Sequence, residues 1–118
     1  MDKTNIPFFT AARPETFKWP VKVPVPGDGR YAYVQFTGVF KYQDEAQAKA
    51  WLEGDKTRTD KQLLAEVLLG VEGLTTVDGQ AVPSTPELVA SVIEVDRVAP
   101  VAVGTYLAAL RGLAAEKN

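Results

Sequence analysis

The sequence predicts an α+β fold, in which an N-terminal antiparallel β-hairpin is followed by about four α-helices. Hydrophobic residues alternate with a period of two from Phe17 to Tyr42. After Tyr42 they recur at spacings of three and four, in segments that begin with helix-capping residues. With 118 residues, 46% of them hydrophobic and 24% charged, the chain has the size and composition of one globular domain.

The first strand of the predicted hairpin, residues 17–42, contains the segment "VKVPVP". Its valines share one face, and prolines alternate with them on the other. Because proline has no N–H to donate to a ladder, we expect this strand at the edge of the sheet. The segment "GDGR" that follows supplies Asp28 and Gly29 for a tight turn.

The second strand, "YAYVQFTGVFKY", is long and aromatic. Phe36 and Phe40 fall on its apolar face, whereas Tyr31 and Tyr33 fall on the more polar face. Exposed aromatic side chains on one face of a sheet act as anchors in protein interfaces. Tyr31 and Tyr33 are therefore candidate partner-binding residues, although single exposed apolar side chains are also common on protein surfaces.

The helical part is predicted over residues 43–116. Its first helix, "DEAQAKAWLEG", has acidic residues at the start and a glycine at the end, as the helix dipole and helix termination favour. A second helix begins with a capping box of Thr59 and Gln62. Its apolar stripe, in "KQLLAEVLLGV", is expected to continue as far as Val71.

Residues 71–89, "VEGLTTVDGQAVPSTPELV", are predicted to connect two helices. Gly73 would close the preceding helix, and Asp78 with the following glycine would form a turn. Ser84 and Glu87 fit a second capping box, which opens the third helix. A last helix is expected from about Pro100, after the break "VDRVAP". A lone aspartate offers too few oxygen ligands for calcium, so this connection is interpreted as a loop.

Composition argues against several classes of function. The chain has no cysteine and no histidine, which removes thiol chemistry, the commonest general base and the commonest transition-metal ligands. No spacing of acidic residues indicates a catalytic carboxylate pair. We therefore expect no enzymatic activity, no metal and no cofactor. A formal net charge of −2, without a basic patch, argues against nucleic acid as a partner.

Residues 1–16 are predicted to form an irregular N-terminal arm ahead of a single domain, residues 17–118. Phe8 and Phe9 in the arm either pack on the edge of the domain or dock on a second subunit of a homo-oligomer, so they are candidate partner-binding residues as well. The apolar cluster around them is too short for a signal peptide, and no apolar run in the chain could span a membrane. The expected location is the cytoplasm.

The ordered set of motifs resembles the tail assembly chaperones of tailed bacteriophages and prophages. The resemblance is carried by three segments and covers most of the chain from about Phe17. They are "FKWPVKVPVPGDGRYAYVQFTGVFK", "DKQLLAEVLLGVEGLTTVDGQAVPSTPELVASVI" and "VAVGTYLAALRG" with the final "KN". The sequence departs from the family pattern at Val71, where an aromatic residue is usual, and at Thr76 and Val77, where acidic character is usual.

The resemblance implies a non-enzymatic role in virion assembly inside a bacterial host cell. Proteins of this family are thought to coat the long helical tape-measure protein before the tail tube polymerises around it, keep it soluble, and then be displaced. The tape-measure protein is thus the implied partner. The alternative is a structural tail component, such as a tail completion or connector protein.

Overall fold

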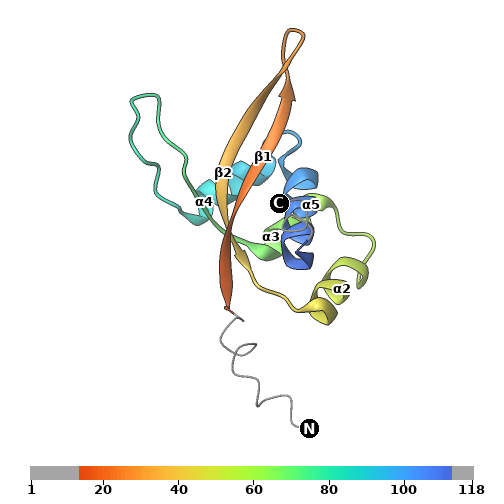
Figure 1. The fold of residues 1–118 in the computed structure, drawn as a ribbon. Coiled ribbons are helices and arrows are strands. Elements are labelled where there is room, and N and C mark those ends of the chain that lie inside the picture. The colour runs from red at the N-terminus through yellow and green to blue at the C-terminus, as the bar shows by residue number, and fades with distance from the viewer. Residues whose placement is uncertain (1–13, 113–118) are drawn as a thin grey trace.

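The computed structural model describes residues 14–112, and it confirms the predicted hairpin and four helices (Figure 1). The elements, in chain order, are β1 (Thr16–Pro26), β2 (Tyr31–Lys41), α2 (Glu45–Glu53), α3 (Asp60–Val67), β3 (Leu68–Glu72), α4 (Pro86–Glu94) and α5 (Val98–Arg111). The first described residues thus lead almost directly into β1.

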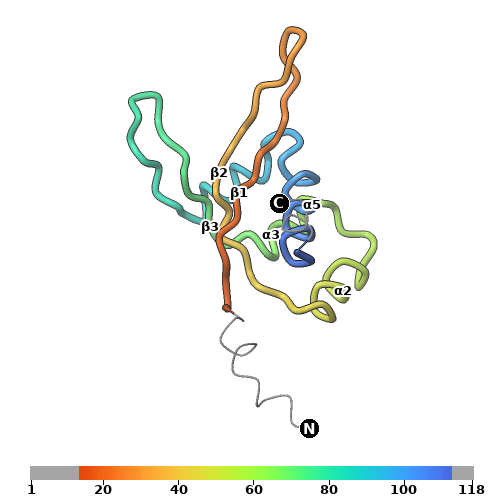
Figure 2. The backbone as a smooth tube through the Cα atoms, viewed as in Figure 1, coloured from red at the N-terminus to blue at the C-terminus, as the bar shows by residue number. Residues whose placement is uncertain are grey.

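The sheet has three antiparallel strands in the order β1–β2–β3. The register places Phe17 opposite Phe40 at one end of the hairpin and Pro26 opposite Tyr31 at the other. Gly29 adopts a φ of 76° in the turn, which a residue with a side chain rarely adopts. The tip of the hairpin projects well beyond the helices (Figure 2).

Helices α3, α4 and α5 contact the sheet from one side, and the core lies between the two layers. Alternate residues of β1 and β2, including Val21, Val23 and Phe36, are buried, while their neighbours on the other face are largely exposed. The period-two pattern of the sequence therefore places the apolar half of the hairpin against the helices, as predicted.

Tyr106 in α5 joins the hairpin to the helices. The residue is fully buried, and its ring lies 6.0 Å from that of Phe17, 5.2 Å from Phe40 and 5.3 Å from Trp51. Its hydroxyl donates a hydrogen bond to the carbonyl oxygen of Lys41 at 2.7 Å. The Tyr106 side chain thus contacts β1, β2 and α2 together.

Helix α2 is attached mainly through Trp51, which is its only buried residue. The indole N–H donates to the carbonyl oxygen of Leu63 at 3.2 Å. Arg58, in the connection to α3, donates to both carboxylate oxygens of Glu66 and to the carbonyl oxygen of Trp51. The predicted capping box of Thr59 and Gln62 is present at the start of α3, so this part of the helical prediction is confirmed.

The prediction that the second helix runs to Val71 is wrong, because α3 ends at Val67 and the chain continues as strand β3. Leu68 already has an extended backbone, with φ −89° and ψ 105°. Val71 lies opposite Gly38 of β2, so it belongs to a strand, and its side chain is buried there. Pairing with an existing hairpin overrides a helical spacing of leucines and valines. Gly73, with a φ of 85°, therefore follows a strand and does not close a helix.

Residues 73–84 form a projecting finger between β3 and α4, where the sequence predicted a connection between two helices (Figure 1). Thr75 pairs with Ala81 in an antiparallel bridge, and the N–H of Val82 donates to the carbonyl oxygen of Leu74 at 2.9 Å. The predicted turn is present, since Gly79 has a φ of 84°. The finger is thus a short, ordered hairpin that carries the turn at its tip.

The predicted capping box of Ser84 and Glu87 is also wrong. Thr85 is the N-cap of α4, and its hydroxyl accepts from the N–H of Leu88 at 3.1 Å. The Ser84 hydroxyl accepts instead from the N–H of Val71 in β3, at 3.0 Å. The hydroxyls of Ser84 and Thr85 are adjacent, and either could cap the helix. Thr85 does so, whereas Ser84 binds the free edge of β3.

The last helix begins at Val98, two residues before the predicted start at Pro100. Arg97 ahead of it has a φ of 69°, in the left-handed region. The reversal of the chain at Arg97 provides the break that the sequence indicated. Pro100 then lies inside the first turn of the helix, where its missing N–H has no intrahelical partner to lose.

Replacing Ser84 with Ala is expected to lower the free energy of unfolding by about 1 kcal/mol, because the buried Val71 N–H loses its acceptor. Urea titration followed by circular dichroism would measure the change. Ser91→Ala, at an exposed position in the middle of α4, is the matched control and should be neutral or slightly stabilising. Equal stability of the two variants would show that the hydroxyl does not support β3.

Candidate binding surface

The outward-facing side chains of the sheet form a long surface that no element of residues 14–112 covers, and we call it the outer strip. Its members alternate with the buried residues of the strands. They include Thr16, Lys18, Pro20, Lys22, Pro24, Pro26, Tyr31, Tyr33, Gln35, Thr37, Val39, Lys41 and Glu72. From Tyr31 to Lys41 the strip is roughly 33 Å long at the usual rise per strand residue.

Two exposed tyrosines mark the hairpin end of the strip. Tyr31 is 63% exposed and Tyr33 is 49% exposed, which places both where the sequence predicted them. Pro26 and Pro24 lie opposite these tyrosines on β1. Rings with few rotatable bonds lose little conformational entropy on binding, and tyrosine is enriched at interface hot spots.

Lysines dominate the charge of the strip. Lys22 lies with its ammonium nitrogen 4.3 Å from the centre of the Tyr33 ring, a cation–π distance. Lys18 pairs with Glu72 of β3 at 3.0 Å. Within the described part of the chain no ion pair involves Lys22 or Lys41. The strip therefore combines an aromatic end with two cations that are available to a partner.

Prolines interrupt the free edge of β1 as a site for backbone pairing. The N–H of Tyr42 donates to the carbonyl oxygen of Glu15, and that of Gly27 donates to Arg30, so odd-numbered residues of β1 make the hydrogen-bonded pairs with β2. The backbone of even-numbered residues therefore faces the free edge. Three of these are proline: Pro20, Pro24 and Pro26. These three residues have no N–H to donate, so another strand cannot form a continuous ladder along this edge.

The edge of β3 is short and partly occupied. The strand has five residues, and the Ser84 hydroxyl already holds the N–H of Val71. A partner that adds a strand would have to displace this contact. Binding at the sheet therefore depends on the side chains of the outer strip.

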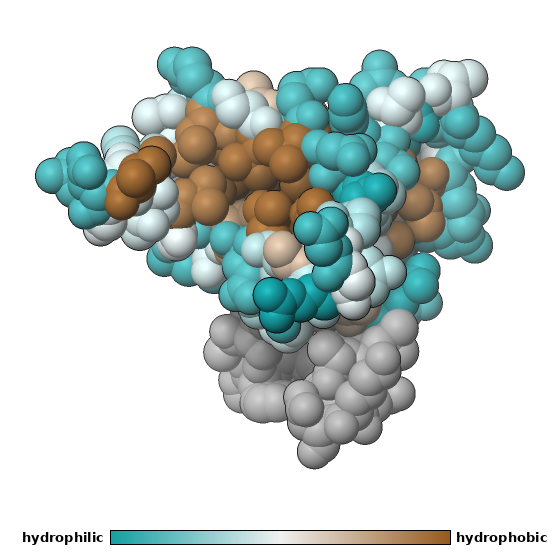
Figure 3. Space-filling model, turned by 90° about the horizontal axis from the view of Figure 1, so that it is seen from above, coloured by the Kyte–Doolittle hydropathy of each residue, from teal (hydrophilic) through white to brown (hydrophobic). Residues whose placement is uncertain are grey.

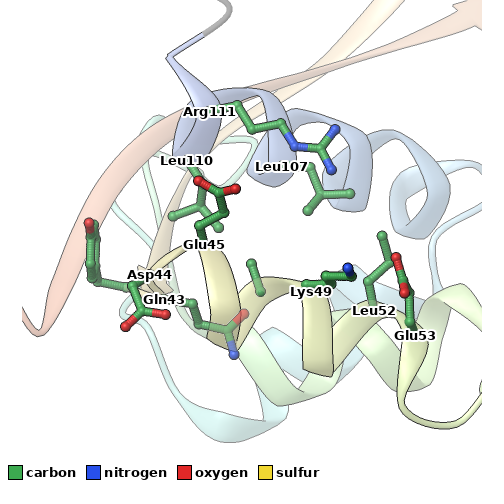
Figure 4. A pocket seen from close by; sticks show the side chains of 11 residues that line it. Gln43, Asp44, Glu45, Lys49, Leu52, Glu53, Leu107, Leu110 and Arg111 are labelled. Atoms are coloured by element: carbon green, nitrogen blue, oxygen red, sulfur yellow. The ribbon is translucent and has the colours of Figure 1, made fainter.

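A groove of about 480 Å³ lies between α2 and α5 (Figure 4). Leu107 and Leu110 project from α5 towards α2. Its lining is Tyr42, Gln43, Asp44, Glu45, Ala48, Lys49, Leu52, Glu53, Leu107, Leu110 and Arg111. Glu45, Lys49 and Glu53 follow one another at intervals of four along α2, the spacing of charge pairs on a solvated helix face. The groove thus combines the charged residues of a solvated face of α2 with apolar residues of α5.

The pKa values of Asp55 and Tyr106 are shifted, and both shifts arise from structural contacts. Hydrogen bonds from Thr57 hold the pKa of Asp55 below its usual value, in the loop before α3. Burial raises the pKa of Tyr106 to about 12, in the core. Neither group borders the groove. Among residues 14–112, no group of three or more His, Cys, Asp or Glu side chains could hold a metal ion.

A further apolar surface lies between the finger and the hairpin. Seen from above, hydrophobic residues form a band between these two projections (Figure 3). Partly buried residues of the bordering elements, among them Val34, Leu74 and Leu88, pack against the core. Val77, at the tip of the finger, is fully exposed. These partly buried residues form the margin of the core.

The sequence prediction covers only part of this surface. Phe8 and Phe9, the other two candidate residues, lie outside the described residues. Lys22, Lys41 and the Lys18–Glu72 pair were not singled out. Their common face could be recognised in the sequence from the same period of two that separated the tyrosines from Phe36 and Phe40. The finger had one local signal, the Asp78–Gly79 turn.

No helix within residues 14–112 has the length and apolar character needed to cross a membrane. Comparisons of the chain with family models, curated proteins and solved structures find no match.

Proposed function

We propose that the protein is a phage tail assembly chaperone, which binds the tape-measure protein and keeps it soluble before the tail tube polymerises. The order of sequence motifs from Phe17 onward supports the family. The observation that carries a binding role is the exposed pair Tyr31 and Tyr33 on a sheet face that no described element covers. An assembly chaperone needs such a surface on its free form, because its partner must later leave.

The outer strip suits reversible binding of a long partner. Prolines interrupt the free edge of β1 and the Ser84 hydroxyl occupies part of the β3 edge, so the complex relies on side-chain contacts and forms no continuous backbone ladder. Contacts of this kind are individually weak. Many copies bound along one tape-measure chain would keep it coated, and the copies could still be released one by one. The site of action is the cytoplasm of the bacterial host.

Co-expression with the tape-measure protein of the same phage tests the proposal. We expect more soluble tape-measure protein, a complex that co-purifies with this chain, and no copies of the chain in mature virions. A tape-measure protein that is equally soluble without this chain would contradict the proposal. Copies of the chain in purified particles, detected by mass spectrometry, would favour a structural tail component instead.

Replacing both Tyr31 and Tyr33 with Ser is expected to weaken binding to the tape-measure protein by about 2 kcal/mol, or roughly 30-fold in Kd. Both side chains are largely exposed, so the melting temperature should stay close to that of the wild type. Isothermal titration calorimetry measures the affinity. Val77→Ser, at the fully exposed tip of the finger, is the control and should leave binding unchanged. Wild-type affinity of the double variant would remove the tyrosines from the site.

A further inference from the structure

The outer strip is positively charged on an otherwise acidic protein. It carries Lys18, Lys22 and Lys41 against Glu72 alone, a net charge of +2. The whole chain has a formal net charge of −2, so the remainder carries −4. Because Lys18 pairs with Glu72, two cations of the strip, Lys22 and Lys41, have no carboxylate partner in the described chain. A partner with carboxylates at matching positions would gain attraction on the strip and be repelled elsewhere.

The spacing of these two cations sets a length for the partner. Lys22 lies opposite Gln35 on β2, and Gln35 is six residues from Lys41. Six strand residues span roughly 20 Å. Four turns of an α-helix cover about 21.6 Å and return side chains to nearly the same face. Carboxylates about 14 residues apart on a helix could therefore reach both lysines.

The interrupted edges of the sheet favour a helical partner over an extended one. An extended segment gains its affinity from backbone pairing at a sheet edge, and the prolines of β1 and the Ser84 hydroxyl interrupt such pairing at the two edges. A helix satisfies its own backbone groups and presents only side chains. The aromatic end of the strip, with Tyr31 and Tyr33, would receive its apolar residues.

We propose that the outer strip binds an acidic amphipathic helix of the partner protein, with its apolar stripe on the tyrosines and carboxylates at Lys22 and Lys41. This inference rests on the proposed function, because it names the kind of tape-measure segment that the chaperone holds. It also gives a reason for the charge asymmetry of the chain. The acidic remainder of each bound copy repels a helix of this kind, so the helix is directed to the strip.

Two synthetic helical peptides of about 22 residues test the charge preference. They share one leucine stripe and differ at two face positions 14 residues apart, which hold Glu in one peptide and Lys in the other. Fluorescence anisotropy at low salt should show the Glu peptide binding roughly tenfold more tightly, as two exposed ion pairs allow. The difference should shrink in 0.5 M NaCl, because salt screens exposed charges.

Lys22→Glu combined with Lys41→Glu should reverse the order of the two peptides. The matched control is Lys49→Glu combined with Lys56→Glu, two exposed lysines outside the strip, and it should keep the wild-type order. Equal binding of both peptides to the wild type, or binding of neither, would overturn the inference. Self-association that the strip variant abolishes, measured by sedimentation velocity, would overturn it in favour of a second copy as the occupant.

Co-expression separates the failure of this inference from the failure of the proposed function. If the strip variant solubilises the tape-measure protein as well as the wild type does, the acidic-helix inference fails and the chaperone proposal stands. If the wild type itself forms no complex with the tape-measure protein, the chaperone proposal fails. The peptide measurements then still show which charge the strip prefers.

Discussion

Replacing Tyr106 with Ala is expected to lower the free energy of unfolding by about 3–5 kcal/mol, the usual cost of deleting a buried aromatic ring. The ring is fully buried against Phe17, Phe40 and Trp51, which belong to β1, β2 and α2. Its loss leaves a cavity where three elements meet, and none of them can fill it alone. Urea unfolding followed by tryptophan fluorescence would measure the effect. A loss below about 1 kcal/mol would mean that the cluster repacks around the cavity.

Tyr106→Phe separates the hydroxyl from the ring. The hydroxyl donates to the Lys41 carbonyl oxygen, with the side-chain oxygen of Gln43 also 3.1 Å away. Removing it should cost about 1–3 kcal/mol, because a buried acceptor loses its donor. Unfolding of this variant should remain cooperative, since the ring contacts stay.

The same variant has a pH signature. Burial raises the pKa of Tyr106 from its ordinary value of 10.0 to about 12, so the unfolded chain gives up this proton at a lower pH than the folded chain does. The contribution of Tyr106 to stability is therefore complete below pH 10 and decreases as the pH rises from 10 towards 12. The wild type should lose more stability over this range than Tyr106→Phe. Parallel losses would show that the phenol titrates equally in both states.

The hairpin could be predicted from the sequence because its signals are local. Alternation fixes which face of each strand is apolar, and it placed Tyr31 and Tyr33 on the exposed face, where the structure has them. The prolines of "VKVPVP" identified an edge strand without any knowledge of the neighbours. The start of a helix with a capping box, such as Thr59 with Gln62, could be predicted from the sequence in the same way.

Strand β3 could not be predicted in the same way, because its structure depends on a distant partner. Leu68 and Val71 fit a helical stripe as well as they fit a strand, and pairing with β2 decides between the two. The misassigned role of Ser84 follows from this, since its hydroxyl caps a strand edge that the sequence did not reveal. The Lys18–Glu72 pair needs the third strand as well. The charge of the outer strip therefore becomes visible only once β3 is in place.

Gly38 shows how tightly the sheet is packed against the core, and replacing it with Ala is expected to lower the free energy of unfolding by about 3 kcal/mol, at the upper end for overpacking. A Cβ there would lie 2.5 Å from Cε2 of Phe40 and 3.1 Å from Cδ1 of Leu68. Both neighbours are themselves buried, and the Phe40 ring cannot move aside without disturbing Tyr106, which packs on it.

Gly104→Ala is the matched control for this prediction. A Cβ at Gly104 meets nothing within 4 Å, and the residue lies on an exposed position of α5. Alanine there should raise the free energy of unfolding by about 0.5–1 kcal/mol, through lower backbone entropy in the unfolded chain. The same chemical change thus has opposite signs in the sheet and in the helix. Urea titrations that give the two variants the same sign would show that the Phe40 ring has room to move, and the close packing of β2 against α5 would have to be revised.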